Sequence, residues 1–193
     1  YTPAIPDNHK QLNHLMEAGF EVKKRSEVLG LISNTMFSVA VAGTHGKTTT
    51  SSMIAHILHE SSVDTTAFLG GIAANFDSNL LLGRSAEAIA VLEADEYDRS
   101  FLQLTPNIEV ITSADPDHLD IYGDHSGMLD SYKEFSKKLK AHGKIFNSES
   151  AQKSLELDNV SVYGENSSIK AVNTRVRGNR YVIDYRSPSH HIE

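Results

Sequence analysis

The chain has 193 residues, 39% of them hydrophobic and 22% charged, which is typical of a folded globular protein and excludes a disordered or collagen-like chain. It contains no cysteine, which excludes disulfide bonds, thiolate metal ligands and a cysteine nucleophile. Its formal net charge of −7 argues against a general nucleic-acid surface, so local features must hold any anionic ligand.

The N-terminal segment is predicted to contain two short helices with a short strand between them. Prolines keep the first six residues extended, because proline fixes φ and lacks a backbone donor. Apolar residues at helical spacing predict a helix that begins after Asp7 or Asn8 and ends at Gly19. Alternation over residues 20–22 predicts the strand, and Ser26 is predicted to open the second helix. This pattern is typical of the end of an α/β unit.

From about residue 36 the chain alternates apolar runs with helical patterns. The run at residues 39–42 is compact and bounded by glycine, as in a buried parallel strand. Further buried strands are predicted at residues 66–69, 89–92 and 108–111. A later amphipathic helix is predicted to place on one face Met128, Tyr132, Phe135 and Leu139. Strands that alternate with helices predict an α/β fold with a P-loop-type, mainly parallel sheet flanked by helices.

Beyond about residue 150, short alternating segments replace the helical pattern. Residues 160–163 and 181–185 alternate in the way that strands do. The stretch at residues 177–180 contains Gly178 and is predicted to form the turn of a hairpin. These features predict an antiparallel β flank on the sheet near the C-terminus.

No apolar run approaches the roughly 20 residues that a membrane-spanning helix requires. The first residues also lack the basic region and the apolar stretch of a signal peptide. We therefore expect a soluble protein of the cytoplasm that binds neither membranes nor nucleic acids.

The strongest chemical signal is the motif GTHGKT at residues 43–48, between a predicted strand and a predicted helix. Glycines let the backbone curl so that N–H groups point inward, and the helix N-terminus adds positive potential. Lys47 supplies a charge for phosphates, and Thr48 offers a hydroxyl to Mg²⁺. An ordinary P-loop has glycine five residues before Gly46, where this chain has Val41, so the loop is shortened. The alternative is a tight turn with a surface lysine.

A second signal is Glu93, which follows the predicted strand at residues 89–92 and opens an acidic stretch. Ligands of open α/β sheets gather beyond the carboxyl ends of strands, so Glu93 is expected to face the same crevice as the glycine loop. Mg²⁺ takes one or two carboxylates as ligands, which suits this position. The alternative for Asp95, Glu96 and Asp98 is a solvated acidic loop.

A third signal is the Asp/His-rich loop that begins at Asp115, after the predicted strand at residues 108–111. A neutral imidazole is a good metal ligand, so His118 is a candidate for a metal site. The other histidines are scattered and are interpreted as surface or helix-face residues.

The three motifs, in this order, resemble those of the Mur ligases of peptidoglycan synthesis. The family's shortened loop, AGTHGKTT, stands at residues 42–49, its EADE motif at residues 93–96 and its Asp-His pair at residues 117–118. The resemblance covers most of the chain and is weakest after about residue 150. It implies that residues 1–35 are the tail of a UDP-binding N-terminal domain with its linker. Residues 36–193 would be an incomplete central ATP-binding domain, and the C-terminal domain would be absent.

The resemblance also implies roles for single residues. Lys47 would contact the phosphates of ATP. Thr48 and Glu93 would hold one Mg²⁺, and His118 would help to place a second. The catalytic residues so implied are Lys47, Glu93 and His118, and those on the substrate side are His45 and Asn79. The nucleotide-binding residues so implied are Gly43, Thr44, His45, Gly46, Lys47, Thr48 and Thr49.

The resemblance is closest to the branch of the family that joins L-alanine to UDP-N-acetylmuramate. It implies an ATP- and Mg²⁺-dependent amide ligase, in which the muramate carboxylate attacks the γ-phosphate of ATP. The amine of L-alanine would then attack the acyl phosphate and give an amide, ADP and phosphate. Domain closure would exclude water from the acyl phosphate.

Three other interpretations stay open. Murein peptide ligases share the motifs but attach a tripeptide to the same sugar nucleotide, and folylpolyglutamate synthetase is a more distant candidate. A nucleotide-binding module without ligase activity is the third, because the domain that closes over ATP would be absent. We expect the chain alone to bind ATP weakly at most and not to ligate.

Overall fold

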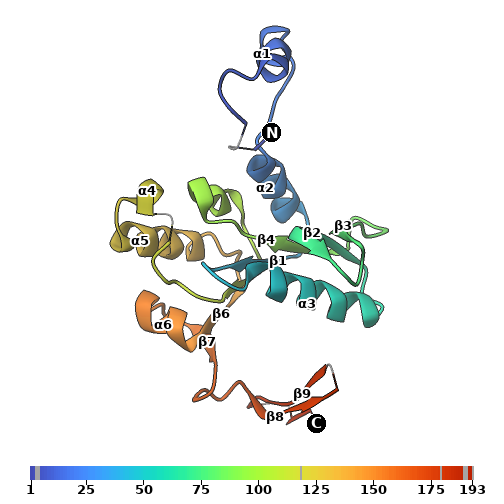
Figure 1. Cartoon of the computed structure of the whole chain (residues 1–193), viewed down its shortest axis with the longest axis vertical. Coiled ribbons are helices and arrows are strands. Elements are labelled where there is room, and N and C mark those ends of the chain that lie inside the picture. Colours follow the sequence, from blue (N-terminus) through green and yellow to red (C-terminus); the bar gives the residue numbers. More distant parts are fainter. Residues whose placement is uncertain (3–4, 118, 179, 189–190, 193) are drawn as a thin grey trace.

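A seven-stranded sheet lies at the centre of the structure, with the strand order β3-β2-β4-β1-β5-β6-β7 (Figure 1). The computed structural model describes residues 1–2, 5–117, 119–178, 180–188 and 191–192. The strands of the sheet are β1 (Ser38–Ala42), β2 (Thr65–Ala73), β3 (Ser78–Leu81), β4 (Ile89–Glu93), β5 (Ile108–Ile111), β6 (Lys144–Ser148) and β7 (Val160–Tyr163). Neighbouring strands are parallel except β2 and β3. The predicted α/β fold with a mainly parallel sheet is confirmed.

Helices cover both faces of this sheet (Figure 1). The helices of the chain are α1 (Lys10–Glu17), α2 (Arg25–Thr35), α3 (Lys47–Glu60), the 3₁₀ helix η1 (Tyr97–Gln103), α4 (Leu119–Tyr122), α5 (His125–Ser136) and α6 (Glu149–Leu155), of which α1 does not cover the sheet. Within the described residues, none of these helices is both long enough and apolar enough to cross a membrane.

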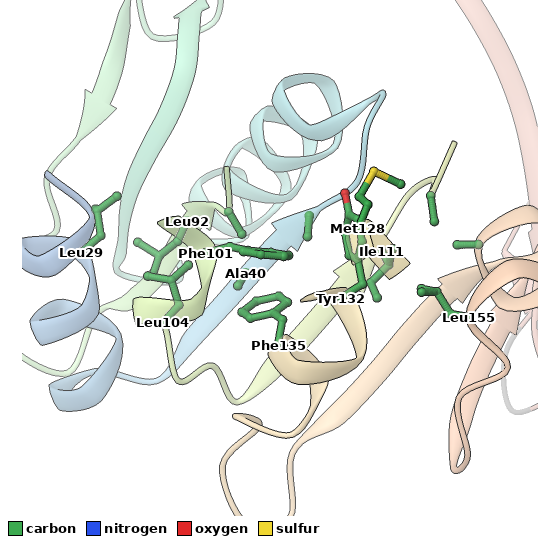
Figure 2. Close-up of a cluster of buried hydrophobic side chains, with 14 of the residues drawn as sticks. Leu29, Ala40, Leu92, Phe101, Leu104, Ile111, Met128, Tyr132, Phe135 and Leu155 are labelled. Carbon is green, nitrogen blue, oxygen red and sulfur yellow. The ribbon is translucent and has the colours of Figure 1, made fainter. Parts of the chain in front are cut away.

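The larger core lies between the sheet and the helices α2, η1, α5 and α6 (Figure 2). Alanines on β1 leave room for aromatic rings on this face. The ring of Phe101 stacks on that of Phe135 at a centroid distance of 4.9 Å and meets Tyr132 edge-on at 5.3 Å. The predicted apolar face of α5 is confirmed for Met128, Tyr132 and Phe135, which are fully buried. Leu139 lies beyond the end of α5.

The other face of the sheet packs on α3. Ala55 of α3 is buried with Leu69 of β2 and Val91 of β4. All five residues of β1 are buried, because this strand has neighbours on both sides and layers on both faces. The compact apolar run in the sequence therefore marks the central strand of the sheet, as expected of a strand buried on both faces.

The N-terminal segment differs in part from the prediction. The helix α1 begins one or two residues later than predicted, after His9, whose Nδ1 accepts a hydrogen bond from the Leu12 amide. It ends before Gly19, which has a φ of 79°. The predicted strand at residues 20–22 is wrong: these residues form a connection without strand pairing, and α2 follows at once, beginning at Arg25. α1 buries none of its residues and stands apart from the sheet (Figure 1).

The C-terminal strands form a second sheet of their own. The antiparallel strands β8 (Lys170–Arg177), β9 (Arg180–Arg186) and β10 (His191–Ile192) have the order β10-β9-β8. The predicted hairpin is confirmed, since Arg177 pairs with Arg180. The predicted antiparallel β region near the C-terminus is therefore confirmed, but it forms a separate sheet and does not extend the main one, and β7 is not antiparallel. Because α6 returns the chain between β6 and β7, these two strands run parallel within the main sheet.

Candidate phosphate-binding site

The glycine loop connects the end of β1 to the start of α3. Gly43 has a φ of 131°, and a Cβ atom there would lie 2.2 Å from Thr112 Oγ1 and 2.8 Å from the Ser113 nitrogen. Only glycine fits so close an approach. Gly46 has a φ of 84° and is the N-cap of α3, so the helix begins at Lys47. The backbone therefore turns from the central strand straight into the N-terminus of a 14-residue helix.

Two hydroxyl residues that follow β5 hold this loop in place. The His45 amide donates to Ser113 Oγ at 2.8 Å, and Thr44 Oγ1 lies 2.9 Å from the same oxygen. Thr112 Oγ1 lies 2.5 Å from the His45 carbonyl oxygen and can donate to it. The sequence prediction missed Thr112 and Ser113, although β5 pairs with β1 up to Ala42 and so brings the following residues beside the loop.

Lys47 points back over the loop that precedes it. Its ammonium donates to the Gly43 carbonyl oxygen and to Glu96 Oε1, both at 2.8 Å. An ammonium group has three N–H donors, so these two contacts leave one for a ligand. The Lys47 side chain is 15% exposed, which keeps the charge accessible at the mouth of the loop.

Thr48 and Glu93, predicted to act together, do meet in the structure. Thr48 Oγ1 donates to Glu93 Oε1 at 3.1 Å, and the Gly70 amide donates to Glu93 Oε2 at 2.7 Å. A Cβ atom on Gly70 would lie 2.2 Å from Glu93 Oε1, so a larger residue there would displace the Glu93 carboxylate. A hydroxyl and a carboxylate are hard oxygen donors of the kind that Mg²⁺ prefers.

These donors fit Mg²⁺ as part of its coordination shell. Among the described residues no group of three or more His, Asp, Glu or Cys side chains is placed to hold a metal ion. Mg²⁺ usually keeps several waters and binds through one or two carboxylates together with substrate phosphates. The arrangement of Thr48 and Glu93 suits an ion that arrives with a polyphosphate.

Glu96 is fully buried, at 0% exposure, so the interpretation of a solvated acidic stretch is wrong for this residue. Its Oε1 contacts Lys47, whereas its Oε2 has no hydrogen-bond partner among the described residues. Burial raises the pKa of Glu96, against the hydrogen bond and the positive charge of Lys47, which lower it. No pattern in the sequence predicted the contact between Glu96 and Lys47.

The main chain of Glu96 is tied to α4. The Tyr122 hydroxyl donates to the Glu96 carbonyl oxygen, and the guanidinium carbon of Arg99 lies 5.6 Å from the centre of the Tyr122 ring. Burial raises the pKa of Tyr122, so its hydroxyl stays protonated and remains a donor. Asp98 and Arg99 both have a positive φ, 53° and 54°, which is strained for residues other than glycine.

The remaining predicted residues are placed less closely together. His45 is exposed at the tip of the loop. Thr49 lies in the first turn of α3 and is also exposed. Asn79 lies on the edge strand β3, separated from β1 by β2 and β4, so the structure does not bring it to the loop. His118 lies outside the described residues.

Comparison with known proteins gives consistent matches. A model of the Mur ligase middle domain matches residues 41–191. A UDP-N-acetylmuramate–L-alanine ligase of Flavobacterium psychrophilum is 47% identical over 193 residues, which are 100% of this chain and 42% of that protein. The structure of UDP-N-acetylmuramate-alanine ligase MurC from Thermotoga maritima matches with a TM-score of 0.73 and 25% identity, over 90% of this chain and 40% of that chain.

A further structural match is the UDP-N-acetylmuramate:L-alanyl-gamma-D-glutamyl-meso-diaminopimelate ligase from Neisseria meningitides. Its TM-score is 0.78 at 22% identity, over 97% of this chain and 64% of that chain, and it supports the fold alone. The chain spans about two-fifths of the length of the Flavobacterium relative, 42%. Because the domain match covers most of the chain and the 47% identical relative covers all of it, the chain belongs to the Mur ligase family.

Proposed function

We propose that this chain is the ATP-binding part of a ligase that joins L-alanine to UDP-N-acetylmuramate. The observation that carries the proposal is the convergence of Lys47, Thr48 and Glu93 at the carboxyl ends of β1 and β4. Open α/β sheets bind their ligands at this edge, and a lysine, a hydroxyl and a carboxylate there suit a magnesium polyphosphate. The substrate class comes from the Flavobacterium relative, which is named for this reaction.

The proposed ligase has its central ATP-binding domain in residues 36–193. Residues 1–35 are proposed to be the end of a UDP-binding domain with its linker. The helix α1 supports a separate N-terminal segment, because it buries none of its residues against the sheet, whereas α2 packs on the sheet through Leu29. Binding of the amino acid and closure over ATP are assigned to a part of the longer ligase outside this chain, and the nucleotide substrates suit an enzyme of the cytoplasm.

In the proposed reaction the residues of this chain bind, orient and neutralise charge. Lys47 places its ammonium against the terminal phosphates of ATP, where the N-terminus of α3 adds positive potential. Thr48 and Glu93 would hold Mg²⁺, which supplies further neutralisation of phosphate charge. His118 is proposed to help place a second Mg²⁺, and His45 to face the sugar nucleotide.

The terminal phosphoryl group of ATP passes to the muramate carboxylate, which forms an acyl phosphate and releases ADP. The amine of L-alanine then displaces phosphate and forms the amide. A cavity of about 80 Å³ between α2 and the loop after β4 is lined by Arg25, Ser26, Glu93 and Asp95, among others. Among the described residues, Arg25 is the one cationic side chain of this lining, which also carries the carboxylates of Glu93 and Asp95.

The first test uses NMR titration to measure the binding of Mg·ATP to the chain and to its Lys47→Ala variant. We expect weak but measurable binding by the chain, and a dissociation constant at least about tenfold higher for the variant, because a charge-assisted contact to phosphate is lost. Lys137→Ala, at the exposed end of α5, is the matched control and should bind like the parent. Equal binding by the Lys47→Ala variant would contradict the phosphate role.

The second test is ligation by a longer ligase that carries this chain, with UDP-N-acetylmuramate, ATP and either L-alanine or a tripeptide as the amine. We expect turnover with L-alanine. Turnover with the tripeptide alone would show that the murein peptide ligase interpretation is the correct one. The chain by itself should not form the amide.

A further inference from the structure

Glu96 is a buried acid that contacts the phosphate-binding lysine. Its side chain is 1% exposed, and the Lys47 ammonium lies 2.8 Å from its Oε1. The two residues are far apart in sequence, and the contact joins the loop after β4 to the loop after β1. Thr48 and Gly70 already bind both oxygens of Glu93, so the two acids contact different partners.

Glu96 is itself held in place by its surroundings. The Tyr122 hydroxyl and the Arg99 amide both donate to its carbonyl oxygen, the latter at 3.0 Å. Tyr122 is only 6% exposed, so this anchor belongs to the core rather than to the surface. A carboxylate on an anchored main chain, surrounded by protein, is a fixed acceptor.

The lysine, in contrast, has a long and flexible side chain. Ordering its four-carbon stem on a phosphate costs side-chain entropy unless the stem is ordered beforehand. In this structure Glu96 and the Gly43 carbonyl oxygen hold two donors of the Lys47 ammonium. The third donor is left for an anion at the mouth of the loop.

We propose that Glu96 is a positioning residue whose carboxylate holds the Lys47 ammonium in the mouth of the loop, ready to receive a nucleotide phosphate. The inference rests on the proposed function, because it requires Lys47 to bind phosphate. The last acid of the EADE motif, Glu96, would then have a different role from the first, Glu93, which is proposed to hold a metal ion.

The test compares Glu96→Gln with Glu96→Leu. Both substitutions remove the charge and keep a side chain of similar size, but only glutamine offers an oxygen to Lys47. We expect the leucine variant to bind Mg·ADP about tenfold more weakly than the glutamine variant, the loss of one hydrogen bond to a charged group. Equal dissociation constants for the two variants would overturn the proposal.

A second comparison repeats the pair in a Lys47→Ala background. A residue that acts through Lys47 has no influence on binding once the lysine is gone, so the difference between glutamine and leucine should disappear. A difference that persists in this background would mean that Glu96 acts on the fold in general. The dissociation constants of Glu96→Gln and Glu96→Leu for inorganic tripolyphosphate in EDTA should still differ. If Glu96 acted as a Mg²⁺ ligand, the difference would disappear without the metal.

Tyr122→Phe keeps the inference testable if the leucine variant does not fold. Loss of the hydroxyl removes one of the two hydrogen bonds to the Glu96 carbonyl oxygen and leaves that of the Arg99 amide. We expect Mg·ADP binding to weaken about threefold with Lys47 present and not at all in the Lys47→Ala background. Unchanged Mg·ADP binding by Tyr122→Phe with Lys47 present would contradict the inference that the Tyr122 hydroxyl holds Glu96 in place. Failure of the parent chain to bind Mg·ADP would instead reject the proposed function, so the two failures are distinguishable.

Discussion

Replacing Glu109 with glutamine should remove a pH dependence from the stability of the fold. Glu109 lies in β5, is 0% exposed, and accepts a hydrogen bond from Ser136 Oγ at 2.5 Å. Its second carboxyl oxygen has no partner among the described residues. Burial raises the pKa of Glu109 from 4.5 to about 7, and the Ser136 hydrogen bond only partly opposes this.

The sign and size of the effect follow from proton linkage. Between pH 4.5 and about 7 the folded chain keeps the Glu109 proton while the unfolded chain has lost it. The free energy of unfolding therefore falls as the pH rises through this window and levels off above it. At about 1.4 kcal/mol per pKa unit, the loss from Glu109 amounts to about 2 to 3 kcal/mol between pH 5 and pH 8.

The measurement is urea unfolding of the parent chain and the Glu109→Gln variant from pH 5 to pH 8. Glutamine is neutral throughout and keeps an oxygen for Ser136, so the variant should gain about 2 to 3 kcal/mol relative to the parent across this range. A constant difference in unfolding free energy between parent and variant at every pH would come from burying an amide in place of a carboxyl group, and not from the titration of Glu109. Glu134→Gln, an exposed position on α5, should leave the pH dependence unchanged. Parallel curves for parent and Glu109→Gln would refute the reasoning.

Three further substitutions test the packing of the loop and of the core. Gly43→Ala should destabilise the fold by about 2 kcal/mol or more and reduce Mg·ADP binding, because its Cβ would lie 2.2 Å from Thr112 Oγ1; an unchanged melting temperature would contradict this. Tyr132→Phe should stabilise the fold by about 1 kcal/mol, because the Tyr132 hydroxyl is buried without a partner among the described residues; a lower melting temperature would reveal a missed contact. Phe135→Ala should lower the free energy of unfolding, measured by chemical denaturation, by about 3 to 5 kcal/mol, since the ring stacks on Phe101 in the core. A loss below about 1 kcal/mol would contradict close packing of this ring.

The features that the sequence predicted well are local ones. The glycine loop was found because a turn from strand to helix needs particular residues at neighbouring positions, as the positive φ of Gly46 shows. The face of α5 was found because helical geometry brings Met128, Tyr132 and Phe135 onto one side. The loop and the helix face depend on a few consecutive turns of chain, so a short window of sequence contains the information.

The features that the sequence did not predict depend on strand order. The strand at residues 20–22 had the right alternation but no neighbour to pair with, and β7 proved parallel because α6 reverses the chain before it. Alternation specifies which side chains share a face, but it does not specify a partner strand. Pairing partners come from the packing of the whole sheet.

The sequence by itself determined the glycine loop, the central strand and the acid at the end of β4. Only the tertiary structure decided that Glu96 is buried against Lys47, and that hydroxyl residues after β5 hold the loop. The reason is the position of β1 between β4 and β5, which brings the ends of three strands together from distant parts of the chain. Contacts between such ends depend on the order of strands in the sheet, and no local pattern of residues records that order.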